Sequence, residues 1–305
     1  MCAIMLLQSS RRVRIAVATL LAAALIFTAC SRQDGSPAGA KPAALPLILV
    51  RGNGPEPDSL DPQRARNFES HSILRDMYEC LTAIGKDAGP IPALASSWEM
   101  DADGRRWTFH LRTDARWPNG DRVTADDVVA GLRRLVEPAT ASEYAQLVDV
   151  IRNAADIIAG RQPPATLGVS APDAATVIIE LTQPAVYLPG LLSHPTTCPV
   201  HRASLARFAS DFVKPGNSVS NGAFGLKEWV QGSHVLLVRN PYYWNNAATR
   251  LDGVRFVSFN DASTEYTRYR AGEIHLTAVV PPNQFDGIRA ERPRELHIGP
   301  QLGVY

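Results

Sequence analysis

Residues Ser97–Leu135 read SWEMDADGRRWTFHLRTDARWPNGDRVTADDVVAGLRRL. In the middle of this stretch, Trp107, Phe109 and Leu111 alternate with polar residues, which is the period-2 pattern of a strand with one buried and one exposed face. The turn-forming residues 101–104 come just before this strand and would reverse the chain. The pattern therefore predicts a β-hairpin.

The second half of the same stretch predicts a helix. Thr124 is followed three residues later by Asp127, which is the spacing of a capping box that opens a helix. Val128, Leu132 and Leu135 then fall on one face of that helix. A hairpin that leads into a capped helix is a scaffold, and no group in it has an obvious chemical role.

The order of residues in this stretch also resembles a known family. WEMDADGRRWTFHLRTDARWPNGDRVTADDVV is similar to the signature of the extracellular solute-binding proteins of peptide importers, family 5, the oligopeptide-binding family. The resemblance continues along nearly the whole chain after the N-terminal segment. It is found in RGNGPEPDSLDP (51–62), TASEYA (140–145), HPTTCPV (194–200), NGAFGLKEW (221–229), NPYYWNN (240–246) and YRAGEIHLT (269–277).

The resemblance implies a fold and a domain organisation. Family members have a mixed α/β (α+β) fold of the periplasmic-binding-protein-like kind (type II, cluster C), in which lobe I carries an inserted subdomain and a second lobe forms the opposite wall of the ligand cleft. Residues 47–79 and 200–302 correspond to lobe I, 80–199 to the inserted subdomain, and 303–305 to the start of the crossover to the second lobe. The second lobe is missing, so we expect the N-terminal portion of a longer protein or a truncated gene product.

The N-terminus has the features of an export signal. Three arginines between positions 11 and 14 form a basic region. The apolar run at 15–27 is shorter than the roughly 20 residues that span a bilayer. The residues just before Cys30 resemble a bacterial lipobox, in which the cysteine becomes the lipidated N-terminus. We expect a signal peptide at 1–29 and lipidation of Cys30, with ordinary signal cleavage and a free periplasmic protein as the alternative.

Composition is consistent with an exported globular protein. Residues 30–46 are mostly Gly, Pro, Ala and polar residues, which cannot bury enough surface to fold and would serve as a tether. The whole chain is 45% hydrophobic and 20% charged, with a formal net charge of +1, and it is long enough for two domains. Nucleic-acid binding usually demands a clustered basic face, and none is apparent. We expect a location in the cell envelope, periplasmic and attached to a membrane by a lipid anchor.

Hydrophobic periodicity and turn residues predict the remaining elements. Helices are predicted at 70–81, in the region 141–160 and at 263–271, the last closed by Gly272. Strands are predicted at 47–50, 254–259 and 273–280, and hairpins are predicted from 167–169 with 175–181 and from 221–229 with 235–239.

Three residues are candidates for ligand binding because the resemblance places them at positions that line the cleft. Arg66 and Phe68 precede the predicted helix at 70–81, in a loop that reaches the peptide cleft in the family. Arg66 stands where better-known relatives carry an acidic residue, so their charge pairing does not carry over. Tyr144 either lines the ligand pocket, as the matching tyrosine does, or is a core residue with its hydroxyl at the rim. The aromatic run 242–244 could cradle a ligand, but we expect it to pack into the core of lobe I.

Cys80 and Cys198 are the two cysteines that follow Cys30. In an exported protein, which meets oxidising conditions, an even pair invites a disulfide. The resemblance places both residues where the chain passes between lobe I and the inserted subdomain, at two crossings that should lie side by side. We therefore expect their Cα atoms within about 7 Å of each other, the distance that a disulfide can span. Two separately buried thiols are the alternative.

No recognisable catalytic motif is present in the sequence. It contains no HExxH, no GxSxG and no Walker A motif. His194 and His201 lie close in sequence, but nothing supplies further metal ligands at a fixed spacing. We expect no enzyme, no cofactor and no metal.

These features predict the substrate-binding component of an ABC importer, a monomer that captures oligopeptides outside the cytoplasmic membrane and delivers them to a permease. Such a receptor can hold the peptide main chain as an added strand, since backbone groups are common to all sequences, while hydrated pockets accept varied side chains. The alternatives are a receptor for a dipeptide, a murein peptide or another small solute, and a degenerate envelope lipoprotein without transport activity. An enzyme is the least favoured class.

Overall fold

The computed structural model describes residues 45–298 of the chain, and every helix and strand below belongs to one unit, Pro46–Tyr305. Four sequence predictions lie outside the described residues: the signal peptide at 1–29, the lipidation of Cys30, most of the tether at 30–46 and the crossover at 303–305. Within residues 45–298, no helix combines the length and the apolar character that crossing a membrane requires.

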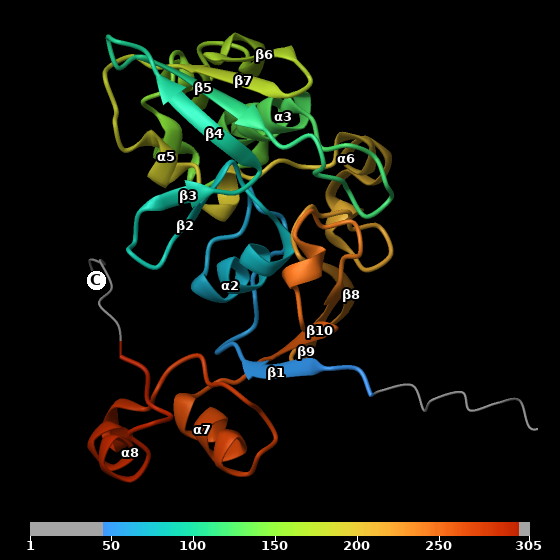
Figure 1. Ribbon diagram of the computed structural model, residues 1–305, viewed down its shortest axis with the longest axis vertical. Helices are drawn as coiled ribbons and strands as arrows, with labels where there is room; N and C mark the ends of the chain where they lie inside the picture. Colours follow the sequence, from blue (N-terminus) through green and yellow to red (C-terminus); the bar gives the residue numbers. More distant parts are fainter. Residues whose placement is uncertain (1–44, 299–305) are drawn as a thin grey trace, which may run out of the picture. The chain divides into compact units, whose positions relative to one another are not determined.

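The first sheet joins segments from both ends of the described chain (Figure 1). Strand β1 (Ile48–Gly52) runs parallel to β10 (Gly253–Val257), and β9 (His234–Arg239) and β8 (Phe224–Val230) extend the sheet in antiparallel fashion. The sheet is therefore mixed, with the order β1-β10-β9-β8. The predicted strands at 47–50 and 254–259 are confirmed as β1 and β10, with small shifts at their ends. The predicted hairpin of 221–229 with 235–239 is confirmed as β8 and β9.

Helix α2 (Phe68–Met77) packs on this sheet. The side-chain oxygen of Asn67 accepts a hydrogen bond from the N–H of Ser70 at 2.9 Å, and this cap starts the helix two residues before the predicted position. Tyr78 has an extended conformation and ends the helix before the predicted position. The shared core consists of Ile73, Leu74 and Met77 of the helix and Val235, Leu237, Val254 and Phe256 of the sheet.

The second sheet is antiparallel, with the order β4-β5-β7-β6. Its strands are β4 (Ala95–Met100), β5 (Arg106–Leu111), β7 (Thr176–Glu180) and β6 (Val169–Asp173). Two hairpins build it: β4 with β5, as predicted, and β6 with β7, in which β6 begins at Val169, where the predicted strand 167–169 ends. The alternation along β5 is confirmed, because Trp107, Phe109 and Leu111 are all buried.

Helix α3 (Ala125–Val136) packs on the second sheet and begins at the predicted capping box. The Asp127 carboxylate accepts hydrogen bonds from the N–H and the hydroxyl of Thr124, at 2.9 and 3.0 Å. The predicted apolar face is confirmed, since Val128, Leu132 and Leu135 are fully buried.

A small two-stranded sheet and short helices complete the described chain. The small sheet pairs β2 (Thr82–Ile84) with β3 (Pro90–Pro92). The shorter α-helices are α4 (Ala154–Ile158), α5 (Leu188–Leu191), α6 (Arg202–Phe208), α7 (Ala262–Arg270) and α8 (Phe285–Glu291). The 3-10 turns are η1 (Pro138–Thr140), η2 (Ala145–Val148), η3 (Pro164–Thr166), η4 (Pro195–Thr197), η5 (Ala209–Val213), η6 (Asn246–Ala248) and η7 (Pro282–Gln284). Helix α7 and its end at Gly272, where φ is +75°, agree with the prediction.

The predicted helical region 141–160 is helical only in pieces. It contains the turn η2 and the short helix α4, and left-handed residues lie at its start and between these two pieces. Ala141 and Asn153 have φ angles of +53° and +66°, which belong to the left-handed region and cannot continue a right-handed helix. The apolar spacing suggested one helix because it carries no information on these two backbone angles.

The predicted strand at 273–280 is wrong. Within this segment only Leu276 forms a bridge, an isolated parallel one with Arg51 of β1. The N–H of Ala278 donates instead to the carboxylate of Glu265. The segment leaves the edge of the sheet there because a buried side chain takes the hydrogen bond that a neighbouring strand would need.

A buried ion pair joins α3 to the loop between β1 and α2. The Arg134 guanidinium donates to both carboxylate oxygens of Asp61, at 2.7 and 2.5 Å, and both side chains are largely buried. In the same loop, the Gln63 amide donates to the carbonyls of Thr196 and Cys198 at 3.2 and 3.1 Å. A bidentate pair of this kind fixes the geometry of the two side chains as well as stabilising the fold. The loop before α2 is therefore held in place by α3 and by the segment 196–198.

Candidate ligand-binding site

The three predicted contact residues lie together where the loop before α2 meets the segment before η2. The hydroxyl of Tyr144 donates a hydrogen bond to the backbone carbonyl of Arg66 at 3.1 Å, although 78 positions separate the two residues. Phe68 is the first residue of α2, and its surface is 55% exposed. The structure therefore brings Arg66 and Tyr144 into contact and leaves Phe68 open to solvent beside them.

Two carboxylates compensate the positive charge of Arg66. Its Nε lies 3.1 Å from an oxygen of Asp58, and its Nη1 lies 3.2 Å from an oxygen of Glu143. Burial acts to raise the pKa of Asp58, but hydrogen bonds from the Ser70 hydroxyl and from Arg66 outweigh it and hold the pKa below its ordinary value. Asp58 is therefore ionised at neutral pH, and Arg66 does not offer an unpaired positive charge.

Two histidine rings pack against the ring of Tyr144. The ring centroids of Tyr144 lie 5.1 Å from His71 and 4.9 Å from His194, and the two histidine centroids are 4.7 Å apart. Burial lowers the pKa of both imidazoles, that of His194 to about 4, and the charge of Arg75 acts in the same direction. Both histidines are therefore neutral at pH 7. Tyr144 thus combines a packed ring with a hydroxyl at the surface, which suits a residue at the rim of a site.

Neither histidine is predicted from the sequence as a member of this site. His71 lies three residues before the buried Leu74 on α2, and His194 opens the segment HPTTCPV. The helical spacing was a signal that His71 is buried, but its contact with His194 depends on the tertiary fold.

A disulfide joins Cys80 and Cys198, with their Cα atoms 4.1 Å apart and 118 positions of sequence between them. The structure therefore does not contain the two separate thiols of the alternative. The Sγ atom of Cys80 lies 3.2 Å from the backbone carbonyl oxygen of His194. The disulfide thus holds the segment that carries His194 next to the end of α2.

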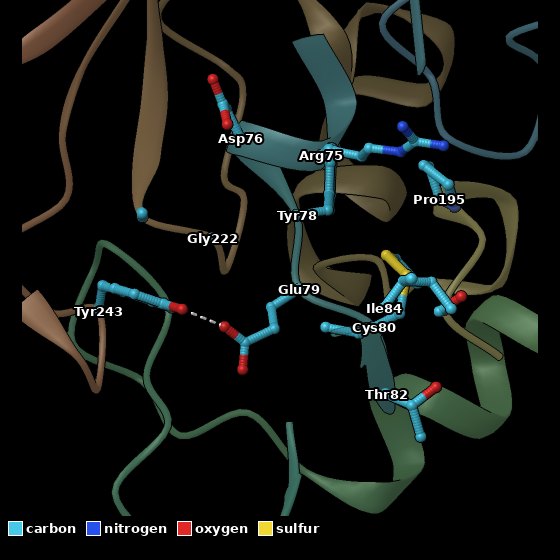
Figure 2. A pocket seen from close by; sticks show the side chains of 14 residues that line it. Arg75, Asp76, Tyr78, Glu79, Cys80, Thr82, Ile84, Pro195, Gly222 and Tyr243 are labelled. Carbon is cyan, nitrogen blue, oxygen red and sulfur yellow. Dashed lines mark hydrogen bonds between the residues drawn. A yellow bond between two sulfur atoms is a disulfide. The ribbon is translucent and has the colours of Figure 1, made fainter. Parts of the chain in front are cut away.

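Beside the disulfide lies a cavity of about 470 Å³, here called the junction cavity (Figure 2). The end of α2, strand β2 and parts of the segments 193–198 and 222–223 line it together with Tyr243. Glu79 accepts hydrogen bonds from the Tyr243 hydroxyl and from the indole N–H of Trp244, the latter at 2.7 Å. The guanidinium of Arg112 lies 3.6 Å from the centroid of the Trp244 ring.

The expectation that the aromatic run 242–244 packs into a core is therefore wrong. Tyr242 is exposed, and Tyr243 and Trp244 are only half-buried. Their polar atoms are used to bind Glu79, which lies more than 160 positions earlier in the sequence. Local pattern reading could not show this acid as their partner.

The junction cavity has two acidic side chains. Burial raises the pKa of Asp76 to about 6, with the charge of Arg51 acting against it. Burial also raises the pKa of Glu79, although the hydrogen bonds from Tyr243 and Trp244 oppose this. Asp76 therefore changes its charge near pH 6 rather than in the ordinary acidic range.

His194 and His201 do not come together. His194 packs with His71 and Tyr144, whereas His201 packs edge-on to Trp117 with ring centroids 5.1 Å apart. His201 also caps α6 by accepting a hydrogen bond from the N–H of Ser204. Within residues 45–298, no group of three or more His, Cys, Asp or Glu side chains is arranged to hold a metal ion.

Known proteins resemble this chain over most of its length. A sequence model of the family described as bacterial extracellular solute-binding proteins, family 5 Middle, matches residues 89–305. The periplasmic oligopeptide-binding protein OppA of Escherichia coli (strain K12) is 39% identical over 292 residues, which cover 93% of this chain and 54% of that protein.

Solved structures show the same likeness. The Escherichia coli murein tripeptide binding protein MppA matches with a TM-score of 0.79 at 37% identity, covering 82% of this chain and 49% of that one. Haemophilus influenzae OppA in complex with the peptide RPPGFSPFR matches with a TM-score of 0.78 at 36% identity, covering 81% and 49%. The predicted mixed α/β fold class is confirmed for the matched part, and the chain spans about half the length of these relatives.

Proposed function

This chain belongs to family 5 of the bacterial extracellular solute-binding proteins, and from that premise we propose that it is the substrate-binding component of an ABC importer. In this role it captures oligopeptides outside the cytoplasmic membrane and delivers them to a permease. The observation that supports the proposal is the hydrogen bond of the Tyr144 hydroxyl to the Arg66 carbonyl, two positions before the exposed ring of Phe68.

These three residues suit a receptor that must accept many peptides. Phe68 offers apolar surface that any aliphatic or aromatic peptide side chain can cover. Tyr144 is a rigid aromatic with a polar tip, so ordering it on binding costs little entropy. The ion pairs of Arg66 with Asp58 and Glu143 leave no strong unpaired charge that would restrict the ligand to one sign.

The proposal is tested with the full-length protein and alanine peptides of two to five residues. Isothermal titration calorimetry should give binding to at least one length, and small-angle X-ray scattering should show closure of the protein on the bound peptide. Mass spectrometry should recover the peptide intact, because the proposed role is not catalytic. Hydrolysed peptide would favour an enzyme, and no binding at any length would contradict the proposal.

A receptor for murein peptides is the second candidate. It is favoured by the 37% identity to the murein tripeptide binding protein MppA. The two candidates separate in a competition experiment, in which a murein tripeptide displaces a bound alanine peptide. Displacement at much lower concentration than an alanine tripeptide needs would favour the murein peptide, and equal concentrations would favour a general peptide receptor. A dipeptide receptor would show as binding of the two-residue alanine peptide alone, whereas another small solute, or loss of transport altogether, would show as failure of both ligands.

The location belongs to the same proposal. The relative OppA is named a periplasmic protein, and the segment before Cys30 resembles a lipobox. We therefore place the protein in the cell envelope as a monomer, lipid-anchored through Cys30, with residues 30–46 as the tether. Wild-type protein expressed in bacteria should incorporate labelled palmitate and partition into detergent, and Cys30→Ala should do neither.

The domain division also remains a proposal. We assign 47–79 and 200–302 to lobe I and 80–199 to the inserted subdomain. Two separate hydrophobic clusters support it, one around α2 and the first sheet and one around α3 and the second sheet. Limited proteolysis under reducing conditions should cut near residues 79–80 and 199–200 before it cuts inside either cluster.

A further inference from the structure

Three aromatic side chains pack against one another at the proposed ligand-binding site. His71 on α2, Tyr144 before η2 and His194 before η4 have ring centroids no more than 5.1 Å apart in every pair. His71 is only 6% exposed. Because the Tyr144 hydroxyl bonds to the Arg66 carbonyl, the two imidazoles help to fix where that hydroxyl and that carbonyl lie.

Each imidazole is accommodated in its neutral form. Nε2 of His71 is buried and has no hydrogen-bond partner among the residues that the structure describes, so a proton added there would be an unmet donor. Nδ1 of His194 accepts a hydrogen bond from the N–H of Thr196 at 3.3 Å, so a proton on that nitrogen would face another donor. Protonation would therefore bury an unpaired donor on His71 and set two donors against each other at His194, and protonating both adds repulsion between like charges. The backbone hydrogen bond at Ala65 favours the charged form of His71, but burial outweighs it.

The charged groups around the two histidine rings mostly do not favour protonation of the imidazoles. Arg75, on the same helix as His71, opposes protonation of both histidines. Asp58 favours protonation of His71, but hydrogen bonds from Ser70 and Arg66 already engage its carboxylate. Glu143, next to Tyr144, pairs with Arg66. The disulfided Cys80 beside His194 does not titrate.

We propose that His71 and His194 are positioning residues of the ligand site: in their neutral forms they hold the ring of Tyr144 in place for a bound peptide, and their protonation releases Tyr144 and weakens capture. This inference rests on the proposed function and adds a dependence of capture on pH. The disulfide supports the inference, because it holds the segment of His194 beside α2 and so keeps the two histidines together.

The pH range follows from the packed and released states. In the packed state burial holds the pKa of His194 at about 4 and that of His71 below its ordinary value. In the released state both rings would regain solvent and titrate nearer to about 6.5, the ordinary value for histidine. Falling pH therefore favours the released state, and capture should be constant above about pH 7 and weaken as the pH drops below about 6.

The test measures peptide affinity of the full-length protein by calorimetry at about pH 7 and about pH 5. Alanine peptides are the probe, because their two termini stay almost fully charged over this range. The wild type is expected to lose affinity roughly tenfold between the two values. The double variant His71→Phe with His194→Asn keeps a ring at one position and a hydrogen-bond acceptor at the other. Its affinity should differ by less than about twofold between the two pH values.

Two further variants separate positioning from a general effect of acid. Tyr144→Ala should bind weakly at both pH values and lose the pH dependence. His110→Asn is the matched control, because His110 lies exposed on β5 beside Glu99 and takes no part in the contacts of the three rings. It should keep the wild-type profile.

Nuclear magnetic resonance gives a second measurement that needs no variant to fold. The ring signals of His71 and His194 in the wild type should titrate at lower pH when peptide is bound than when it is absent, since peptide favours the packed state. Unchanged titration midpoints on saturation with peptide, a constant wild-type affinity, or a double variant that keeps the tenfold loss would each overturn the inference. Absence of peptide binding by the wild type at pH 7 would overturn the proposed function, and the inference with it.

Discussion

Phe68 is exposed over 55% of its surface although it begins a helix whose later apolar side chains are fully buried. Single exposed apolar residues are common on proteins and cost little. At this position, however, the residue follows Arg66 by two positions, and the Arg66 carbonyl accepts the hydrogen bond of the Tyr144 hydroxyl. Phe68 therefore contributes little to the core and has surface free for a ligand.

Phe68→Ala should weaken peptide binding roughly tenfold, because an aromatic contact of this size contributes on the order of 1–2 kcal/mol when a ligand covers it. The thermal midpoint should hardly change. Tyr187→Ala is the matched control, since Tyr187 is 53% exposed and lies at the N-cap of α5, away from the contact residues in sequence and in element. Equal losses of affinity in the two variants would show that Phe68 has no specific role.

For single residues, the sequence identifies the candidate ligand-binding positions better than the residues that these positions contact. The family resemblance picked out Arg66, Phe68 and Tyr144, and the structure brings Tyr144 into contact with Arg66, two positions before Phe68. It could not show that Arg66 pairs with Glu143, 77 positions away, and with Asp58. Pairings across such distances depend on how the loop before α2 and the segment before η2 meet in the fold.

At the scale of elements, the start of α3 shows what a local pattern contains and what it leaves out. The capping box between Thr124 and Asp127 was visible in the sequence and is present. The same carboxylate also accepts hydrogen bonds from Nε of Arg202 at 2.9 Å and from Nε1 of Trp117 at 3.4 Å. The cap is therefore also a joint that holds the start of α6 against α3.

Asp127→Asn should lower the free energy of unfolding by about 2 kcal/mol, because it weakens several charge-assisted hydrogen bonds at one buried carboxylate. Asp126→Asn is the control: Asp126 lies in the same first turn but is exposed, and its loss should be within about 0.5 kcal/mol. Urea denaturation with an unchanged m-value measures both. If the two variants lost the same stability, the helix dipole alone would account for the effect and the joint would have no energetic role.

The elements that the sequence predicted incorrectly share a physical cause. The region 141–160 has helical apolar spacing, but its first residue, Ala141, has left-handed backbone, and so does Asn153 between η2 and α4. The segment 273–280 has the composition of a strand, but the carboxylate of Glu265 takes the N–H of Ala278. A backbone angle decides the first case and a hydrogen bond from another element decides the second. Hydrophobic periodicity encodes neither.

At the scale of the whole described unit, the disulfide between Cys80 and Cys198 closes a loop of 118 positions. A crosslink over a loop of this length removes much conformational freedom from the unfolded chain, which in the chain-entropy model is worth about 4–5 kcal/mol. The sequence could supply both cysteines, but their proximity depended on the family resemblance. The crosslink should therefore act on the whole second sheet rather than on one element.

The double variant Cys80→Ser with Cys198→Ser should unfold at a clearly lower guanidinium concentration than the oxidised wild type, by about 4 kcal/mol or somewhat less. Adding a thiol reductant should lower the wild-type midpoint towards that of the variant and leave the variant unchanged. A wild-type midpoint that does not respond to reductant would mean that the two thiols are not bonded in the protein.

Two partly buried groups make the stability of the unit depend on pH in opposite directions. Burial raises the pKa of Asp76 to about 6, so this residue binds its proton more readily in the folded state than in the unfolded one, and its contribution to stability is lost as the pH rises through 6. Burial lowers the pKa of His194 to about 4, so the unfolded state binds the proton more readily, and stability is lost as the pH falls from about 6.5 towards 4. Between these values the two effects largely cancel.

Asp76→Asn removes the contribution of Asp76 to the pH dependence of stability and leaves that of His194. At about pH 7 the variant should be more stable than the wild type by on the order of 2–3 kcal/mol, because it no longer keeps a buried charge that the fold disfavours. The difference should shrink as the pH falls and vanish near pH 4, where Asp76 of the wild type is neutral in both states. Thermal unfolding at several pH values measures it, with the exposed Asp103→Asn as control. A difference that stays the same from pH 4 to pH 7 would show that the change acts through packing in the junction cavity rather than through charge.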